Sequence, residues 1–171
     1  MTALDWADEI AAPEAERAAV SCLLLLPGAE AKRLVDTLRP DDVTDMRLAH
    51  VLTASRRLLD QGVRPDPVTV LADLQRYGLA RWFSANREAG VYLADLAADA
   101  PSPGSWAHYT GVVVEAAYRR RVQQAAQRLQ QAAGDGPLED LQELLDSEVT
   151  ALHDAASRLP AYQRRTEPCT P

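Results

Sequence analysis

The chain has 171 residues, long enough for one domain with a hydrophobic core, and its 47% hydrophobic and 25% charged residues are typical of a globular protein. Its net charge of −7 disfavours direct binding to DNA, because an acidic surface repels phosphate groups. Lys32 is the only lysine and Arg33 follows it, so the sequence lacks the Gly-Lys-Ser/Thr of a P-loop. We therefore expect no autonomous ATPase or helicase activity.

Six helices are predicted in the first hundred residues, several of them with recognisable ends. Pro13 suits the first position of a helix, and Asp66 is placed to cap the helix that follows it. Gly62 is a natural stop for the helix before it. The predicted ranges are 13–26, 30–38, 46–61, 67–77, 79–83 and 91–98.

Two longer helices are predicted at 105–133 and 138–156, joined by a tight turn at 134–137. Helices joined by so short a connection lie antiparallel. Apolar residues recur along the second helix at steps of three, four, four and three, which predicts a coiled-coil-like seam. The residues of this predicted seam are Leu138, Leu141, Leu145, Val149 and Leu152.

Together these elements predict an all-α fold, a six-helix globular bundle followed by a long antiparallel helical hairpin. Few aromatic residues and many Ala and Leu residues also favour helices over sheet. The predicted parts are a flexible N-terminus at 1–11, the globular bundle at 12–100, the hairpin at 101–157 and a disordered tail at 158–171.

Three blocks of the sequence resemble the N-terminal domain of DnaB-type replicative helicases. They are Glu14-Ala15-Glu16 with Val20 and the leucines after it, Gly62-Val63-Arg64-Pro65-Asp66 with Val68-Thr69-Val70, and the stretch from Gly90 to Arg121. Their order and spacing, with the hairpin after them, resemble that domain over residues 12–156.

The resemblance implies a domain that performs no chemistry and holds proteins together. In that family the domain pairs through its hairpin, three dimers form a collar ring, and the domain binds the C-terminal part of the DnaG-type primase. The family's ATPase domain follows it in the helicases, whereas a short tail follows here, as in a stand-alone relative or a fragment.

Four positions depart from the family pattern. Val43 stands where the family usually has Phe, Leu48 where it has His, and Leu52 near a usual Phe. Ser105 replaces a usual Asn and is still suited to cap the long helix. We interpret the first three as changes in core packing.

We expect the hairpin to mediate self-association, because two helices projecting from a small globule cannot bury both of their apolar faces alone. The alternative is that the two arms bury only each other. The interface residues expected are Tyr109, Val113, Ala116, Leu141, Leu145 and Leu152.

Two further groups are candidates for partner binding. Arg119, Arg120 and Arg121 form either a solvated helix face or a docking site for an acidic partner. Trp82 and Phe83 either fill the edge of the globule or form an exposed hot spot for a partner, since aromatic residues and arginine dominate such sites.

No residues form a catalytic or metal-binding constellation, so we expect no metal and no cofactor. Cys22 is expected in the core, and neither it nor Cys169 belongs to a CxxC pair. His50, His108 and His153 fall on separate predicted helices. The sequence opens with no signal peptide and has no run long enough to span a membrane, so we expect a cytoplasmic protein.

Two functions are consistent with the sequence. The first is a non-enzymatic interaction module of the replication machinery, a homodimer or a trimer of dimers that binds primase or a replicative helicase. The second is a scaffold or dimerisation protein that has reused the fold and has no role in the replisome.

Overall fold

The computed structural model describes residues 12–83, 86–135 and 137–159, and it contains helices and no strand over these ranges. The all-α prediction is therefore confirmed. The α-helices are α1 (Ala12–Leu23), α2 (Gly28–Thr37), α3 (Met46–Asp60), α4 (Pro67–Arg76), α5 (Asn86–Ala98), α6 (Trp106–Asp135) and α7 (Leu138–Ser157). Three short 3-10 helices are η1 (Pro40–Asp42), η2 (Ala80–Phe83) and η3 (Pro103–Ser105).

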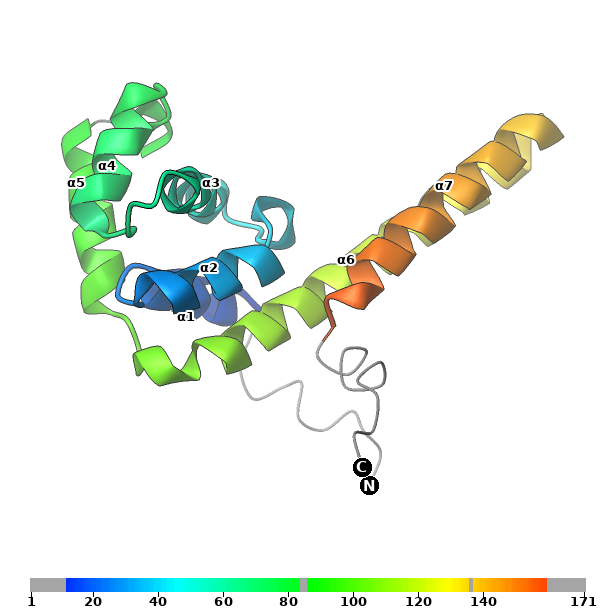
Figure 1. Ribbon diagram of the computed structural model, residues 1–171. Helices are drawn as coiled ribbons and strands as arrows, with labels where there is room; N and C mark the ends of the chain where they lie inside the picture. The colour runs from blue at the N-terminus through cyan, green and yellow to red at the C-terminus, as the bar shows by residue number, and fades with distance from the viewer. Residues whose placement is uncertain (1–11, 84–85, 136, 160–171) are drawn as a thin grey trace, which may run out of the picture. The chain divides into compact units, whose positions relative to one another are not determined.

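The chain divides into two compact units, residues 1–113 and 114–171, and α6 runs from one into the other. In the first unit α3 is central and packs against α1, α2 and α4, while α5 packs against α4 and α1 (Figure 1). The interior is aliphatic and includes Cys22, as expected. Its largest fully buried side chains include Leu23, Leu24, Leu26, Leu34, Leu38, Leu52, Leu74, Leu93 and Leu96.

The first helix is shorter than the predicted 13–26, because α1 ends at Leu23. Pro27 disfavours helical geometry at the residue before it. The carbonyl oxygens of Leu25 and Leu26 leave the helix and accept hydrogen bonds from the Arg64 guanidinium at 2.8 and 3.0 Å. Arg64 therefore joins the end of α1 to the loop that precedes α4.

The cap predicted at Asp66 is present. Its carboxylate accepts hydrogen bonds from the backbone N–H groups of Val68 and Thr69 at 2.8 and 2.9 Å. The Thr69 hydroxyl in turn accepts from the Asp66 N–H at 2.9 Å, which completes a capping box.

Gly62 ends α3 in a left-handed conformation, with φ of +74°. The Val63 N–H donates a hydrogen bond to the Leu58 carbonyl at 2.8 Å, and the Gly62 N–H donates one to the Leu59 carbonyl at 3.0 Å. These are the two hydrogen bonds of a Schellman motif. Gly78 ends α4 in the same way, with φ of +68°. Both glycines are therefore required by backbone geometry.

Replacing Gly62 with Ala is expected to lower the free energy of unfolding by about 1–2 kcal/mol, because an L-residue is strained in the left-handed region. Urea unfolding followed by circular dichroism measures the change. Gly28→Ala is the matched control, since Gly28 lies in α2 with open space around its Cβ position, and it should change stability by less than about 0.5 kcal/mol. An equal effect of both substitutions would contradict the strain argument.

The turn that follows α7 contains the first two residues of the predicted tail. Arg158 and Leu159, placed in the tail by the sequence, form the turn that ends α7, and Arg158 is only 7% exposed. The Leu159 N–H donates to the Ala156 carbonyl at 3.0 Å. The predicted flexible N-terminus and the rest of the predicted tail lie outside the described residues.

Candidate interaction surfaces

The second unit is a helical hairpin whose two arms are joined by an ion pair. The Arg128 guanidinium donates from Nε to Glu148 Oε1 at 2.6 Å and from Nη2 to Oε2 at 2.9 Å. These bonds lower the pKa of Glu148 and raise the pKa of Arg128. The contact is bidentate and joins one turn of α6 to one turn of α7.

The positions of α7 that are not exposed define the seam between the arms. They are Leu141, Leu144, Glu148, Leu152 and Ala155, at steps of three, four, four and three, with Ala156 beside the last of them. The matching positions of α6 are Arg121, Ala125, Leu129 and Ala132. Small residues on α6 allow the two helices to approach closely.

The predicted seam had the same spacing as the observed one. In the middle of α7, however, its residues Leu145 and Val149 each come one residue after the observed seam residues Leu144 and Glu148. Leu141 and Leu152 belong to the observed seam. Leu138, Leu145 and Val149 do not, since they are 78%, 45% and 45% exposed. All five positions of the predicted seam are apolar, whereas the observed seam includes Glu148, so the apolar pattern of the sequence favoured the wrong positions.

The exposed apolar residues lie on one face of the hairpin. On each helix they follow a seam position by one residue, a rotation of about 100°, except Leu138, which lies seven residues before Leu145 and so on the same side of α7. Because the helices run in opposite directions, the same rotation on both brings these residues to the same side. We call this surface the apolar hairpin face; its residues are Val122, Ala126, Ala133, Leu138, Leu145 and Val149.

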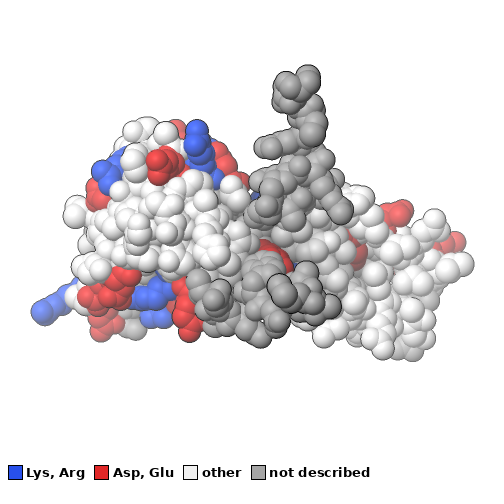
Figure 2. All heavy atoms as spheres, turned by 90° about the horizontal axis from the view of Figure 1, so that it is seen from below, with Lys and Arg blue, Asp and Glu red and all other residues white. Residues whose placement is uncertain are grey.

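The opposite face of the hairpin is polar. Most positions that precede a seam residue by one are exposed, and the polar ones among them include Gln124, Gln131, Asp140, Glu143 and Ser147. Figure 2 shows hairpin surface that is largely uncharged, with acidic side chains at its margin. The hairpin is thus amphipathic across its two faces, as expected for a surface that binds another apolar face.

The residues predicted for self-association occupy different environments. Leu145 lies on the apolar hairpin face, whereas Leu141 and Leu152 are half-buried in the seam. Val113 is fully buried within the chain, and Tyr109 and Ala116 are half-buried. The sequence reading missed Val122, Leu138 and Val149 as interface candidates because only the fold shows them to be exposed.

The arginine triplet is less available than its sequence suggests. Arg119 donates to Glu115 Oε1 at 2.7 Å, an ion pair between successive turns of α6. Arg120 and Arg121 are half-buried, and each has contacts of its own. The three side chains do not form one uniformly exposed cluster, and their role in docking stays a prediction.

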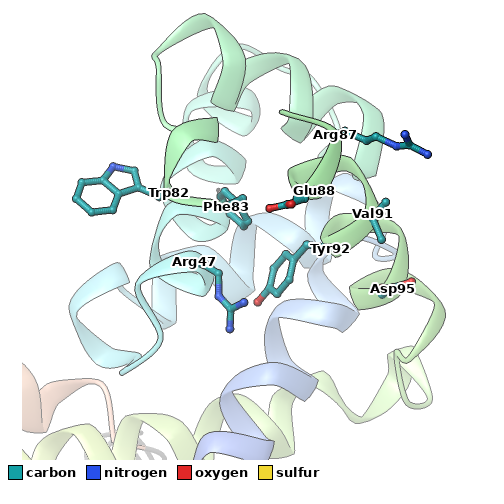
Figure 3. Close-up of a pocket in the computed structure, with 8 residues that line it drawn as sticks. All are labelled: Arg47, Trp82, Phe83, Arg87, Glu88, Val91, Tyr92 and Asp95. Atoms are coloured by element: carbon teal, nitrogen blue, oxygen red, sulfur yellow. The ribbon is translucent and has the colours of Figure 1, made fainter. Parts of the chain in front are cut away.

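A groove of about 510 Å³ in the first unit is the second candidate surface (Figure 3). We call it the aromatic groove. Residues from α3, η2 and α5 line it: Arg47, Trp82, Phe83, Arg87, Glu88, Val91, Tyr92 and Asp95. A concave surface rich in aromatic and arginine side chains is typical of a protein-binding hot spot.

Tyr92 is held in the groove by its neighbours. Its ring lies 5.2 Å from that of Phe83, and the Arg47 guanidinium carbon lies 4.8 Å from its centroid. Burial raises the pKa of the Tyr92 hydroxyl. Arg47 is itself fixed by Asp45, which accepts from its Nη2 at 2.8 Å and has a lowered pKa as a result.

The structure separates the predicted pair of aromatic residues. Phe83 is 4% exposed and forms part of the core, while Trp82 is 48% exposed at the edge of the groove. Consecutive residues of a 3-10 helix point about 120° apart, so burial of one exposes the other. Phe83 therefore fills the edge of the globule, whereas Trp82 is exposed and its role in partner binding stays a prediction.

His50 packs against Trp82, with ring centroids 5.8 Å apart. Its buried Nε2 has no hydrogen-bond partner among the described residues. Burial, followed by the nearby charge of Arg57, lowers the pKa of His50 below its usual value of 6.5. Near neutral pH the imidazole is therefore uncharged.

Stability is expected to fall as the pH drops below about 6.5, because the unfolded chain then binds a proton at His50 before the folded chain does. Replacing His50 with Gln removes this contribution, so the unfolding free energy of the variant should depend less steeply on pH between 6.5 and 5. Urea unfolding across that range measures the difference. Above pH 7.5 the two pH profiles should run parallel, and a variant as pH-sensitive as the wild type would refute the assignment.

Neither metal-binding nor membrane-spanning features were found in the part of the chain that the structure describes. No three His, Cys, Asp or Glu residues there are grouped to hold a metal ion. None of the helices there is long and apolar enough to cross a membrane.

Comparisons with known proteins agree with this architecture. The DnaB-like helicase N terminal domain family matches residues 8–115. The replicative DNA helicase DnaB of Mycobacterium leprae (strain TN) is 32% identical over 146 residues, which are 83% of this chain but only 23% of that protein. The crystal structure of the N-terminal domain of DnaB helicase from Mycobacterium tuberculosis matches with a TM-score of 0.68 and 27% identity, covering 81% of this chain and 94% of that one. The chain therefore belongs to the family of DnaB-like helicase N-terminal domains.

Proposed function

We propose that this chain is a non-catalytic interaction module of the replication machinery that self-associates through the apolar hairpin face. The observation that carries the proposal is the exposure of Leu138, Leu145 and Val149 on one face of a two-helix unit. Apolar side chains clustered in this way are unfavourable in water and are usually covered by a partner.

A second copy of the hairpin is the partner that fits best. Two amphipathic hairpins that pair their apolar faces form a four-helix bundle, in which each face is buried against an identical one. The small side chains of Ala126 and Ala133 leave room for the larger residues of the opposing copy. A symmetric homodimer therefore needs no additional binding surface.

The replisome partner proposed is a DnaG-type primase or a DnaB-type helicase, docking at the aromatic groove. Its exposed anchors are Trp82 and Val91, at 48% and 54% exposure. Arg87 and Glu88, both exposed at the rim, supply polar contacts of either sign. The arginine triplet is a second docking candidate on the hairpin.

Self-association is tested by light scattering coupled to size-exclusion chromatography, on the purified chain over a range of concentrations. A mass of twice 18.7 kDa or a higher even multiple supports the proposal. A monomer at all concentrations would exclude hairpin pairing.

Partner binding is tested separately by titrating the chain with the purified C-terminal domain of primase and with the purified replicative helicase. Binding that is lost on Val91→Glu and kept on Val68→Glu, a substitution at an exposed valine of α4 outside the groove, supports docking at the groove. Absence of binding to both proteins would favour the reuse of the fold as a scaffold outside the replisome.

A further inference from the structure

A second feature of the first unit is a surface on α4 and η2 that carries aromatic and basic residues together. Between Asp73 and Glu88 the sequence contains no acidic residue, although the chain has 25 of them. Within this stretch Arg76, Tyr77, Arg81 and Trp82 are all exposed. We call these four residues the basic-aromatic surface.

Both aromatic rings are about half exposed and have cationic groups beside them. Tyr77 is 50% exposed, and the guanidinium carbons of Arg57 and Arg76 lie 4.3 and 5.9 Å from its ring centroid. Trp82 is 48% exposed, and the guanidinium carbon of Arg81 lies 5.8 Å from the centroid of its ring. Figure 3 shows Trp82 extending away from η2.

The two rings lie along the same side of α3. Tyr77 contacts Arg57 of that helix, and Trp82 contacts His50. His50 and Arg57 are seven residues apart, which places them on one face at a separation of about 10 Å. The rings therefore form two successive platforms on one surface rather than two unrelated exposed residues.

The local charge of this surface is positive despite the net charge of the chain. Asp73 is neutralised by its ion pair with Arg57. Neither Arg76 nor Arg81 is ion-paired within the described ranges. Arg76 and Arg81 therefore each bring a positive charge to the surface beside its two rings.

We propose that the basic-aromatic surface binds single-stranded nucleic acid. Its components are those that such binding requires: exposed rings on which bases stack, and arginines that contact the backbone phosphates. Stacking on Tyr77 and Trp82 would be tolerant of sequence, because every base has a π-face. Nucleic-acid binding goes beyond the proposed protein interactions and would allow the domain to retain a single strand of DNA or RNA.

An acidic peptide is the competing occupant, and the geometry favours it less. A peptide anchor needs a concave apolar pocket, whereas the aromatic groove beside Trp82 includes the carboxylates of Glu88 and Asp95 in its lining. Tyr77 projects from the surface and does not line that groove. Projecting rings suit the flat faces of unpaired bases.

The test is fluorescence anisotropy with the full 171-residue chain and fluorescein-labelled (dT)12 and (rU)12, with a DNA duplex of the same length for comparison. Both single strands should bind more tightly than the duplex. The affinity should fall about sevenfold between 50 and 200 mM salt, as expected for two phosphate contacts. A preference for one of the two strands identifies the physiological source as DNA or RNA.

Substitutions then locate the site. Trp82→Ala and Tyr77→Ala should each weaken binding at least about fivefold, and the double substitution Arg76→Gln/Arg81→Gln should remove most of the salt dependence. Arg33→Gln, on α2, and Val68→Ala, on α4, are controls that remove an exposed charge and an exposed apolar group elsewhere. Unchanged thermal unfolding shows that each variant is folded.

Three results would overturn the proposal: no binding of either single strand at 50 mM salt, equal binding of single strand and duplex, or variants at Tyr77 and Trp82 that bind like the controls. Competition by polyglutamate with the same dependence on Trp82 and Tyr77 would instead assign the surface to an acidic peptide. Because the hairpin is untouched in these variants, their oligomeric state reports independently on the proposed self-association.

Discussion

Introducing two glutamates on the apolar hairpin face, Leu145→Glu with Val149→Glu, is expected to abolish the proposed self-association and leave a monomer. Both side chains are 45% exposed within the chain, so the substitutions leave the seam and the core intact. In a paired hairpin each new carboxylate would be buried without a partner, which costs several kcal/mol. The dissociation constant should therefore rise at least about 100-fold. Sedimentation equilibrium measures the change.

The control places the same two charges on the polar face. Gln124→Glu with Ser147→Glu changes the net charge equally, and both positions are exposed. This variant should associate like the wild type. If both variants dissociate, the effect is general repulsion between acidic chains; if neither does, copies contact each other elsewhere.

The all-α class and two helix boundaries were predicted correctly, whereas the helix predicted at 91–98 begins five residues earlier, at Asn86. Asp66 and Gly62 act through hydrogen bonds within a few residues, so their roles are encoded locally. The end of α1 was placed three residues too late: Pro27 signals the stop, but the carbonyl groups that leave the helix before it are bound by Arg64, which is 38 residues away from Leu26. Local patterns cannot report such a contact.

The departures from the family pattern at Val43, Leu48 and Leu52 were interpreted correctly as core positions. They are 9%, 3% and 1% exposed. Substitutions there change packing inside the globule and leave both candidate surfaces as they are. They give no reason to expect different partners.

The candidate surfaces were predicted less well, because exposure is a property of the packed chain. The seam contains a charged residue, Glu148, whose side chain is only 12% exposed and is satisfied by Arg128. A search for apolar periodicity passes over such a position and selects its neighbour, Val149. The sequence also does not reveal which of Trp82 and Phe83 is buried, because the two residues are adjacent and both are aromatic.

The largest effect on stability is expected at the ion pair between α3 and α4. The Asp73 carboxylate accepts from Arg57 Nη2 and from Nε at 3.1 Å, and its side chain is 5% exposed. Asp73→Ala leaves the guanidinium partly buried with no partner, which should cost about 2–4 kcal/mol of unfolding free energy. For a protein with a total stability of about 5–15 kcal/mol this is a large fraction, and urea unfolding resolves it readily.

Two further variants separate the cost of an unpaired charge from the value of the pair itself. Asp36→Asn removes the partner of Lys32 in an exposed pair, where both side chains are about half accessible, and should cost less than about 1 kcal/mol. Arg57→Met with Asp73→Leu replaces both charges by apolar groups and should recover most of the stability lost in Asp73→Ala. Failure to recover would mean that Arg57 stabilises the fold in another way, for example through its contact with Tyr77 at 4.3 Å. In that case the double variant should also alter nucleic-acid binding, since Arg57 would be the residue that positions one of the two rings.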